Sequence, residues 1–400
     1  MIERCSVPFM LGRALCLVFS LFVFMAIFIT DAGANPSVTL HYIERVIDRP
    51  PVLSNLHAMP EDQGLIGARL GVADVNATGK FTNHEINLIE HILHPEDSLA
   101  DLAKDINAES MLIIANLPVD DLLELANFPW KNDVVIINTI EKDNSLRSEK
   151  CHQNVLHTIP SRAMLSDSLA QFLLLKRWQK WFLIEGGQVG DQQFASALRN
   201  SAKKFGAEIV GDKKWLFDAD MRRNAQSEVP PFTQGSEYDV VVVADESGDF
   251  GDYLLYHTWY PRPVVGTQGM FPVAWHPVVE QYGATQLQNR FKKLAKRPMN
   301  DVDYAAWLAV SSVGEAIIRG NKKSASDIKT YLLSDAFRVA AFKGRALTFR
   351  PWSGQMRQPI PLVHRGAVVS MSPQPGFLHQ RTELDTLGLD TNNVARCGEE

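Results

Sequence analysis

The sequence predicts an α/β protein built from two doubly wound parallel-sheet lobes. Short apolar runs alternate with segments of helical periodicity from residue 38 onward, and the series begins again after Pro160. Strands that alternate with helices are typical of a parallel sheet covered by helices on both faces. The length of 400 residues also exceeds what one hydrophobic core usually serves, which favours two lobes.

The first 34 residues have the features of a secretory signal peptide. Arg4 and Arg13 precede an apolar run over 14–29, and a small-x-small pattern follows at 32–34. The apolar run is shorter than the ~20 residues that a membrane span requires, which favours cleavage after residue 34 over an uncleaved anchor. We therefore expect signal peptide 1–34 and a mature protein in the periplasm.

The composition excludes one class of partner and points to one covalent link. A net charge of −6, a pI near 6.0 and scattered basic residues argue against nucleic-acid binding. Once the signal peptide is removed, the mature chain keeps Cys151 and Cys397. In an oxidising compartment such a pair predicts one disulfide, with two free thiols as the alternative.

The first series of elements follows from local pattern. The segment 64–77 places Leu65, Ala68, Val72 and Val75 on one helical face, and Ser98 is a suitable N-cap for the next helix. The segment 133–140 contains a Val-Val-Ile-Ile run that indicates a strand buried on both faces. The expected strands are 38–46, 84–93, 111–117 and 133–140, and the expected helices are 64–77, 98–108 and 120–127.

The second series repeats this order. It starts with a long helix that carries Leu165, Leu169, Phe172 and Leu173 on one side. The Pro and Gly residues of 229–235 indicate a loop. The expected helices are 161–178 and 191–205, and the expected strands are 180–185, 207–216, 239–244 and 263–266.

The last part of the chain departs from the alternation. A strong helix is expected at 301–319, where Trp307, Val310, Val313 and Ile317 share a face, and a second at 325–333. The segments 346–351 and 359–363 are predicted as edge strands, followed by a polar tail from Thr382.

Four motifs in this order resemble those of class I periplasmic solute-binding proteins of the Leu/Ile/Val type. They are the segments 67–76, 157–161, 303–307 and 343–349. The resemblance implies the periplasmic binding protein type I fold, in which a three-segment hinge joins the lobes near Pro160, Val278 and Pro351. The N-terminal lobe would be 35–159 plus 279–350, and the C-terminal lobe with the tail 160–278 plus 351–400.

A narrower resemblance concerns residues 143–171. The segments 143–147, 160–165 and 167–171, with Cys151 and His157, look like ABC-transporter substrate-binding proteins associated with pyrroloquinoline-quinone (PQQ) dependent alcohol dehydrogenase systems. That resemblance implies a monomeric periplasmic protein that binds a small solute by lobe closure and delivers it to an ABC permease in the inner membrane. A ligand-sensing receptor or an accessory protein of the dehydrogenase system is the alternative.

Ligands of such sheets bind beyond the carboxyl ends of the strands, in the cleft between the lobes. The Leu/Ile/Val-type binding proteins that this sequence resembles hold the carboxylate of their ligand with hydroxyl-bearing turns after the third and fourth strands. Here Asn116 ends the third strand, and Thr139 and Glu141 follow the fourth. Glu141 would repel a bound carboxylate, so a standard amino-acid ligand is disfavoured.

The second lobe contributes acidic and aromatic residues to the predicted site. Asp245 and Glu246 follow a buried strand, and Trp259 and Trp275 lie in later loops, the second of which also carries Gln268 and Phe271. Such a rim suits a flat ring, an alcohol or aldehyde, or a cation. The acidic loop has oxygens that a hard metal ion could use, but acidic loops are more often solvated turns, so neither metal nor cofactor is predicted.

No motif of catalysis accompanies this site. The sequence lacks a Gly-x-Ser-x-Gly nucleophile turn, a Gly-x-Gly-x-x-Gly dinucleotide fingerprint and a His-Glu-x-x-His zinc helix. A binding protein rather than an enzyme is therefore expected.

Overall fold

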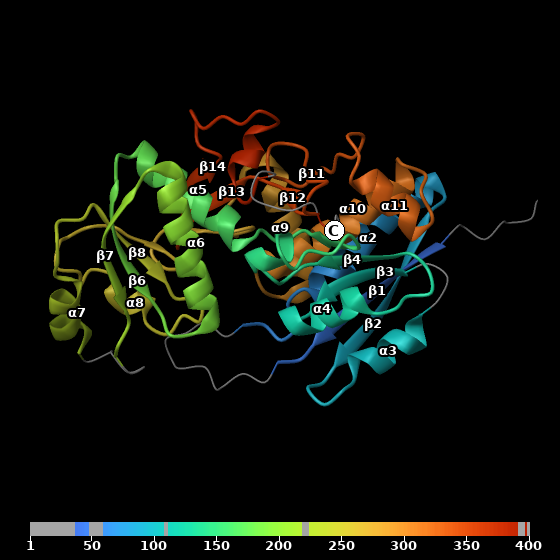
Figure 1. The fold of residues 1–400 in the computed structure, drawn as a ribbon. Coiled ribbons are helices and arrows are strands. Elements are labelled where there is room, and N and C mark those ends of the chain that lie inside the picture. Colours follow the sequence, from blue (N-terminus) through green and yellow to red (C-terminus); the bar gives the residue numbers. More distant parts are fainter. Residues whose placement is uncertain (1–36, 48–58, 108–110, 218–223, 391–396, 398–400) are drawn as a thin grey trace, which may run out of the picture.

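The computed structural model describes residues 37–47, 59–107, 111–217, 224–390 and 397. The predicted signal peptide lies outside these residues. Two α/β lobes lie side by side, with the C-terminal strands β11 to β14 between them (Figure 1). Within the described part of the chain, no helix combines the length and apolar character needed to cross a membrane.

The first lobe has a five-stranded parallel sheet in the order β2-β1-β3-β4-β5. One hydrophobic core lies between this sheet and the pair α2 and α10, and a second core lies on the opposite face with α3 and α4. Alternate residues of β1 supply the two cores: Leu40 and Tyr42 face the first, and Ile43 the second. The strands are β1 (Ser37–Arg45), β2 (Glu85–Leu93), β3 (Met111–Asn116), β4 (Val134–Asn138) and β5 (Val155–His157).

Helices cover both faces of this sheet, and two details explain their placement. Ser98 caps α3, because its side chain accepts the N–H of Asp101. A Cβ at Gly67 of α2 would stand 2.0 Å from the carbonyl oxygen of Asp303, so glycine permits the close approach of α2 and α10. The helices of this lobe are α2 (Leu65–Thr82), α3 (Leu99–Ile106), α4 (Val119–Asn127), α9 (Ala284–Ala295), α10 (Asp301–Ile318) and α11 (Ala325–Leu332).

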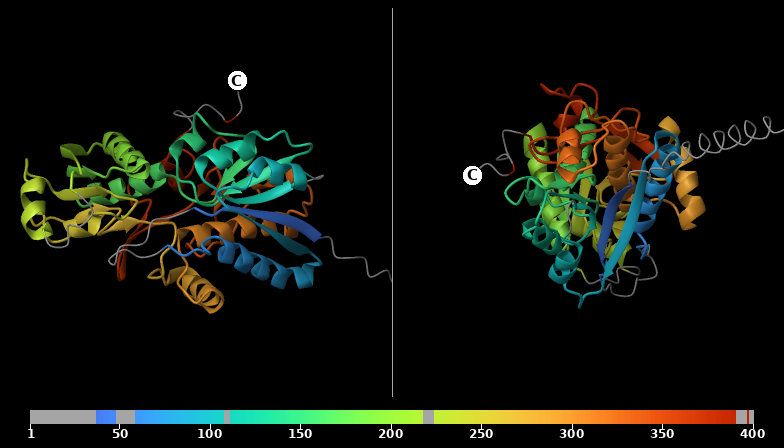
Figure 2. Two further views of the ribbon diagram at one scale, coloured as in Figure 1. Left: turned by 90° about the horizontal axis from the view of Figure 1, so that it is seen from below. Right: turned by 90° about the vertical axis from the view of Figure 1, so that its right-hand side faces the viewer.

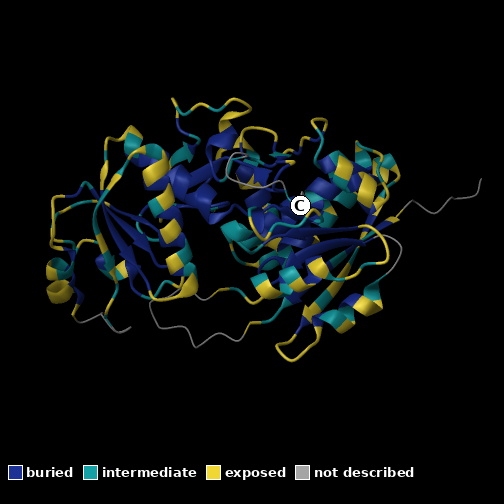
Figure 3. Ribbon diagram, in the orientation of Figure 1, coloured by how far each residue is buried: buried dark blue, intermediate teal, exposed yellow. Residues whose placement is uncertain are grey.

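The second lobe has a four-stranded parallel sheet in the order β7-β6-β8-β9. Helices α5 and α6 pack on one face and α7 and α8 on the other, and each face has its own hydrophobic core. The strands β6 and β8 are buried almost throughout (Figure 3). The elements are α5 (Arg162–Leu175), β6 (Lys180–Glu185), α6 (Val189–Phe205), β7 (Glu208–Lys214), α7 (Ala225–Thr233), β8 (Val240–Ala244), α8 (Gly251–Leu254) and β9 (Val264–Gly266).

The C-terminal part forms two small antiparallel sheets between the lobes (Figure 2). One sheet has the order β10-β13-β14, and the other pairs β11 with β12. Their bounds are β10 (Phe271–Pro272), β11 (Thr348–Phe349), β12 (Met356–Arg357), β13 (Ile360–His364) and β14 (Ala367–Ser372). Short 3₁₀ turns occur at η1 (Asn144–Arg147), η2 (Gln281–Gly283) and η3 (Glu383–Thr386).

The predicted α/β architecture of two parallel-sheet lobes is confirmed, but three local predictions are wrong. The segment 229–235, predicted as a loop, lies mostly in α7, which accommodates Pro230 and Pro231 because Ala225, Val229 and Thr233 are buried one turn apart. The segment 359–363 contains β13, which is the central strand of its sheet rather than an edge. The tail after Thr382 is not merely polar, since Leu384 and Leu387 are buried.

Residues near two of the three predicted crossings are hydrogen-bonded to each other. Gln355 Nε2 donates to the carbonyl of Ile159 over 3.0 Å, and Gln358 Nε2 donates to that of Thr158 over 2.7 Å. The buried Lys343 Nζ donates to Gln358 Oε1 over 2.6 Å, and burial lowers the pKa of Lys343 to about 7. The predicted lobe boundaries stay a prediction. Near the third predicted crossing, Met356 belongs to the core of the first lobe and Ile360 to a core of the second lobe.

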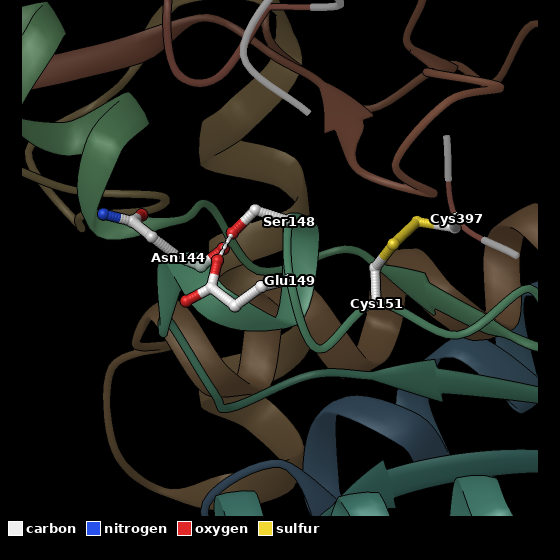
Figure 4. The surroundings of a disulfide bond; sticks show 5 residues. All are labelled: Asn144, Ser148, Glu149, Cys151 and Cys397. Atoms are coloured by element: carbon white, nitrogen blue, oxygen red, sulfur yellow. Dashed lines mark hydrogen bonds between the residues drawn. A yellow bond between two sulfur atoms is a disulfide. The ribbon is translucent and has the colours of Figure 1, made fainter. Parts of the chain in front are cut away.

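The predicted disulfide is present and joins Cys151 to Cys397, with 5.3 Å between their Cα atoms (Figure 4). Cys151 follows η1 in the first lobe. The bond therefore fastens the end of the chain to the first lobe, close to the turn in which Ser148 Oγ donates to the carbonyl of Asn144.

Candidate functional site

A cavity of about 500 Å³ lies between the two lobes. The segments that follow β4, β8 and β9 line it, as expected for parallel sheets whose carboxyl ends face a shared cleft. The amino ends of α5 and α10 complete the wall. The lining residues include Gln63, Glu141, Lys142, Arg162, Leu165, Phe194, Asp245, Glu246, Gln268, Phe271, Asp301 and Val302.

Glu141 stands on a turn that Asn138 holds rigidly. The buried Asn138 side chain accepts the N–H of Glu141 over 2.9 Å and donates to the carbonyl of Glu141 over 2.8 Å. No described residue donates a hydrogen bond to the carboxylate of Glu141. Burial raises the pKa of Glu141, although the positive charges of Arg162 and Arg147 oppose the rise. The cavity therefore contains a carboxylate that is positioned but lacks a hydrogen-bond donor among the described residues.

The remaining charges of the first-lobe wall belong to Lys142 and Asp301. Lys142 Nζ lies 4.0 Å from Asp301 Oδ2, and Asp301 Oδ1 accepts the N–H of Trp275 over 2.8 Å. These contacts offset most of the negative charge of Asp301.

An ion pair within the second lobe forms the opposite wall. Arg162, in the first turn of α5, donates through Nε to Glu246 Oε1 over 3.0 Å and through Nη2 to Glu246 Oε2 over 2.6 Å. Asp191 Oδ1 holds the backbone of Glu246 by accepting its N–H over 2.6 Å. Arg162 is only 8% exposed, and its Nη1 has no hydrogen-bond partner among the described residues.

Asp245 organises its own loop. Its Oδ1 accepts the N–H of Asp249 over 2.8 Å, and its Oδ2 accepts the N–H groups of Phe250 and Gly251 over 3.0 and 2.7 Å. The residue is 1% exposed. Its oxygens are thus occupied by loop donors. Among the described residues no group of three or more His, Cys, Asp and Glu side chains is arranged to hold a metal ion.

The amino end of α5 points toward the cleft but is already capped. Arg162 N–H donates to the carbonyl of Lys142 over 2.9 Å, Ala163 N–H donates to Asn144 Oδ1 over 2.9 Å, and Met164 N–H donates to Ser161 Oγ over 3.2 Å. Free N–H groups at a helix start form an anion site. Here the chain itself consumes them.

Three of the seven residues predicted for the site line the cavity, namely Glu141, Asp245 and Glu246. Asn116 lies behind the wall, where its Nδ2 donates to Tyr42 Oη and to the carbonyl of Gln63. Thr139 is fully buried, and its Oγ1 donates to the carbonyl of Ala115 over 3.1 Å.

The two tryptophans predicted for the rim lie elsewhere. Trp275 is 3% exposed and stacks on Tyr304 with ring centroids 4.7 Å apart, inside the core of the first lobe. Trp259 is 47% exposed and lines a separate hollow with Tyr256 and Pro261. The aromatic residues that do line the cavity are Phe194 and Phe271.

Sequence reasoning missed Arg162 and Phe194. Arg162 lies at the start of the helix predicted over 161–178, beside the first predicted crossing, so a charged residue at that position was a usable signal. Phe194 sits on α6 and carried no signal beyond helical periodicity.

Comparison with known families and structures identifies the fold. A profile of the family described as periplasmic binding protein matches residues 56–250. A search of curated proteins found no match. The leucine-, isoleucine-, valine-, threonine- and alanine-binding protein of Brucella ovis in its closed conformation is 15% identical, with a TM-score of 0.62, and the match covers 82% of this chain and 89% of that chain.

Two further structures agree with this assignment. A branched-chain amino acid ABC transporter ligand-binding protein of Burkholderia xenovorans is 15% identical, with a TM-score of 0.61 and coverage of 84% and 95% of the two chains. An ABC transporter solute-binding protein of R. palustris, solved with benzoate, is 12% identical, with a TM-score of 0.60 and coverage of 83% and 95%. The chain therefore has the periplasmic binding protein type I fold, and the matched family and these structures are described as binding proteins.

Proposed function

We propose that this protein is the periplasmic substrate-binding component of an ABC transporter and that it takes up a small solute by closing its lobes. The observation that carries this proposal is the cavity of about 500 Å³, which both lobes line at the carboxyl ends of their sheets. Its size and mixed lining suit a small molecule. The family match and the transporter proteins of the same fold support it.

The finer parts of the proposal rest on the sequence. The predicted signal peptide at 1–34 would direct the protein to the periplasm, where a permease of the inner membrane would receive the solute from a monomeric carrier. The narrower resemblance over residues 143–171 supports a link to PQQ-dependent alcohol oxidation.

A ligand screen by thermal unfolding tests the proposal. A solute that binds only the native state raises the melting temperature by mass action. The screen would contain PQQ, short alcohols and aldehydes, amines, carboxylates, amino acids and metal ions. We expect at least one small organic solute to raise the melting temperature.

A cavity-filling variant is the control for this screen. Val302→Trp places a large ring in the cavity that Val302 lines. The melting-temperature shift should vanish in this variant, while its melting without ligand stays close to that of the wild type. A screen with no responding solute, or a response that Val302→Trp leaves intact, would contradict binding between the lobes.

A ligand-sensing receptor of the dehydrogenase system is the alternative, since it would use the same cleft. Deleting the gene separates the two. Loss of solute uptake supports the carrier, whereas normal uptake with altered transcription of the oxidation genes supports the sensor.

A further inference from the structure

We infer that the cleft selects a small organic cation, a protonated amine on an apolar body, whose ammonium group bonds to Glu141. This inference rests on the solute-binding function proposed above and specifies its substrate class. The transporter proteins of similar fold include a structure with leucine and one with benzoate, both of which carry a carboxylate. Here the chemistry of the cavity favours the opposite charge.

The charges that line the cavity are unequal. Four carboxylates, those of Glu141, Asp245, Glu246 and Asp301, face two cationic side chains, Lys142 and Arg162. A ligand with a positive charge reduces this imbalance, and one with a negative charge increases it.

Pairing within the wall leaves one carboxylate available. Glu246 is taken by the two-point contact with Arg162, and Asp301 is compensated by Lys142 and the N–H of Trp275. Asp245 is saturated by N–H groups of its loop. Glu141 is the lining carboxylate to which no described residue donates a hydrogen bond. Glu141 is partly buried, so its carboxylate is partly removed from water, and a ligand that supplies a charged donor gains most at this point.

The nearby cations do not replace such a ligand. Arg147 is fully buried, and its guanidinium donates to Gln355 Oε1 and to the carbonyls of Asp143 and Ile159. It moderates the charge of Glu141 from a distance without a hydrogen bond to the carboxylate. No ion pair within 4.0 Å joins Arg162 to Glu141 among the described residues, since Arg162 is directed to Glu246.

An anionic head group has few partners in this cleft: among the described residues, Arg162 Nη1 is unpartnered but buried, and Lys142 lies 4.0 Å from Asp301. The amino end of α5 is capped by Lys142, Asn144 and Ser161, and the guanidinium of Arg162 is neutralised by Glu246. Glu141 would repel a carboxylate placed beside it.

Beside the polar Gln63, Thr267 and Gln268, the remaining lining contains an apolar part that fits an apolar body. Leu165, Phe194, Phe271 and Val302 face the cavity together with Ile140, Pro272 and Val273. An ammonium group near a phenyl face also gains a cation–π contribution. The cleft thus combines one available carboxylate with an apolar part of its wall, which fits a monoamine better than a polyamine.

Matched ligand series test the inference by calorimetry and thermal unfolding. One series is isoamylamine, isoamyl alcohol, isocaproate and leucine, and the other is benzylamine, benzyl alcohol and benzoate. Within each series the carbon skeleton is nearly constant and the head group changes. We expect an amine to bind at least about tenfold more tightly than its carboxylate partner.

Two variants locate the effect. Glu141→Gln keeps the shape of the side chain and removes its charge, and it should weaken amine binding by about tenfold to 100-fold while changing alcohol binding by less than about twofold. Glu208→Gln, an exposed position on β7, is the matched control and should leave both unchanged.

The outcomes separate this inference from the proposed function. Tighter binding of leucine, isocaproate or benzoate in a manner that Val302→Trp abolishes overturns the cation selectivity and leaves the solute-binding function intact. Failure of every amine to bind, or amine binding that Glu141→Gln leaves unchanged, also overturns the selectivity. Amine binding that survives Val302→Trp contradicts both the cation selectivity and the proposed binding between the lobes, because the ligand then lies outside the cleft.

Discussion

The loops after β4 and β8 face each other across the cavity, and both carry acidic side chains, yet their carboxylates differ in what surrounds them. In the second lobe, Asp245 is saturated by backbone N–H groups and Glu246 is paired with Arg162. In the first lobe, Glu141 accepts no hydrogen bond from a described residue. Acidic residues at equivalent ends of parallel strands thus serve structure in one lobe and remain available for a ligand in the other.

A count of charges therefore does not describe this binding site. What matters is the number of donors that each carboxylate already has within the protein. A saturated carboxylate stabilises the loop that supplies its donors, and its removal leaves those donors unsatisfied. A carboxylate without donors costs stability when it is buried, and this cost is recovered when the ligand binds.

The largest expected effect is on stability and compares Asp245→Ala with Glu141→Ala. Asp245→Ala leaves the N–H groups of Asp249, Phe250 and Gly251 without their acceptor, so we expect a loss of about 3 kcal/mol in the free energy of unfolding. Glu141→Ala removes no hydrogen bond from a described donor and should change stability by at most about 1 kcal/mol. Urea denaturation at neutral pH measures both. Equal losses of unfolding free energy in the two variants would contradict the view that Asp245 stabilises its loop and Glu141 does not.

A second experiment removes the partner of Arg162 in the second-lobe wall, so that Arg162 becomes available to a ligand. Glu246→Gln deprives Arg162 of its counter-charge in a position that is largely buried, so the guanidinium becomes a partner for a carboxylate. We expect benzoate and isocaproate to gain about tenfold in affinity. Glu237→Gln, which disrupts the exposed pair with Arg262, is the control and should cause no gain. If Glu246→Gln still binds amines more tightly than carboxylates by the same factor as the wild type, the pairing of Arg162 with Glu246 is not what excludes anions.

A smaller effect is expected from pH. Burial raises the pKa of Glu141, so its carboxylate is protonated at a higher pH than that of an exposed glutamate. The groups that act on it are Arg162 and Arg147, which favour its charged form, and Asp143 and Glu246, which oppose it. Amine affinity should fall as the pH drops from neutrality through this pKa, because the amine stays protonated while Glu141 loses its charge.

Calorimetric titrations from neutral to mildly acidic pH follow this change. The fall should not exceed the loss caused by Glu141→Gln, which removes the charge entirely, and that variant should bind the amine with little pH dependence. A fall of the same size in Glu141→Gln would assign the titration to another group.

The smallest effect concerns the aromatic residues predicted for the rim. Trp259 lies in a separate hollow and Trp275 within the core. Trp259→Ala should therefore change amine affinity by less than about twofold, whereas Phe194→Ala, at the cavity wall, should weaken it by more. A strong loss in Trp259→Ala would extend the site beyond the cavity.

Much of the fold follows from local pattern, and the departures have physical reasons. The apolar run at 180–185 predicts β6 within its observed bounds, and Ser98 predicts the start of α3. Local pattern failed for α7, because Pro230 and Pro231 argue against a helix that tertiary burial nevertheless retains. It also gave no sign of β10 or β12, which have two residues each and no periodicity.

The candidate site was less predictable for the same reason. Strand ends indicate which loops face the cleft, and this is why Glu141, Asp245 and Glu246 were expected at the cavity that they line. Glu246 already has a partner within the protein because it pairs with Arg162, a residue far away from it in the sequence. The burial of Trp275 depends likewise on its stacking with Tyr304. Such long-range pairings leave no local trace in a single sequence.

The crystal structure of the protein with its tightest-binding amine tests the central claim most directly. The amine should lie between the lobes with its nitrogen within hydrogen-bond distance of a carboxylate oxygen of Glu141, while the ion pair of Arg162 and Glu246 stays intact. An amine bound outside the cavity, or one whose nitrogen contacts Glu246 after that pair has opened, would contradict it.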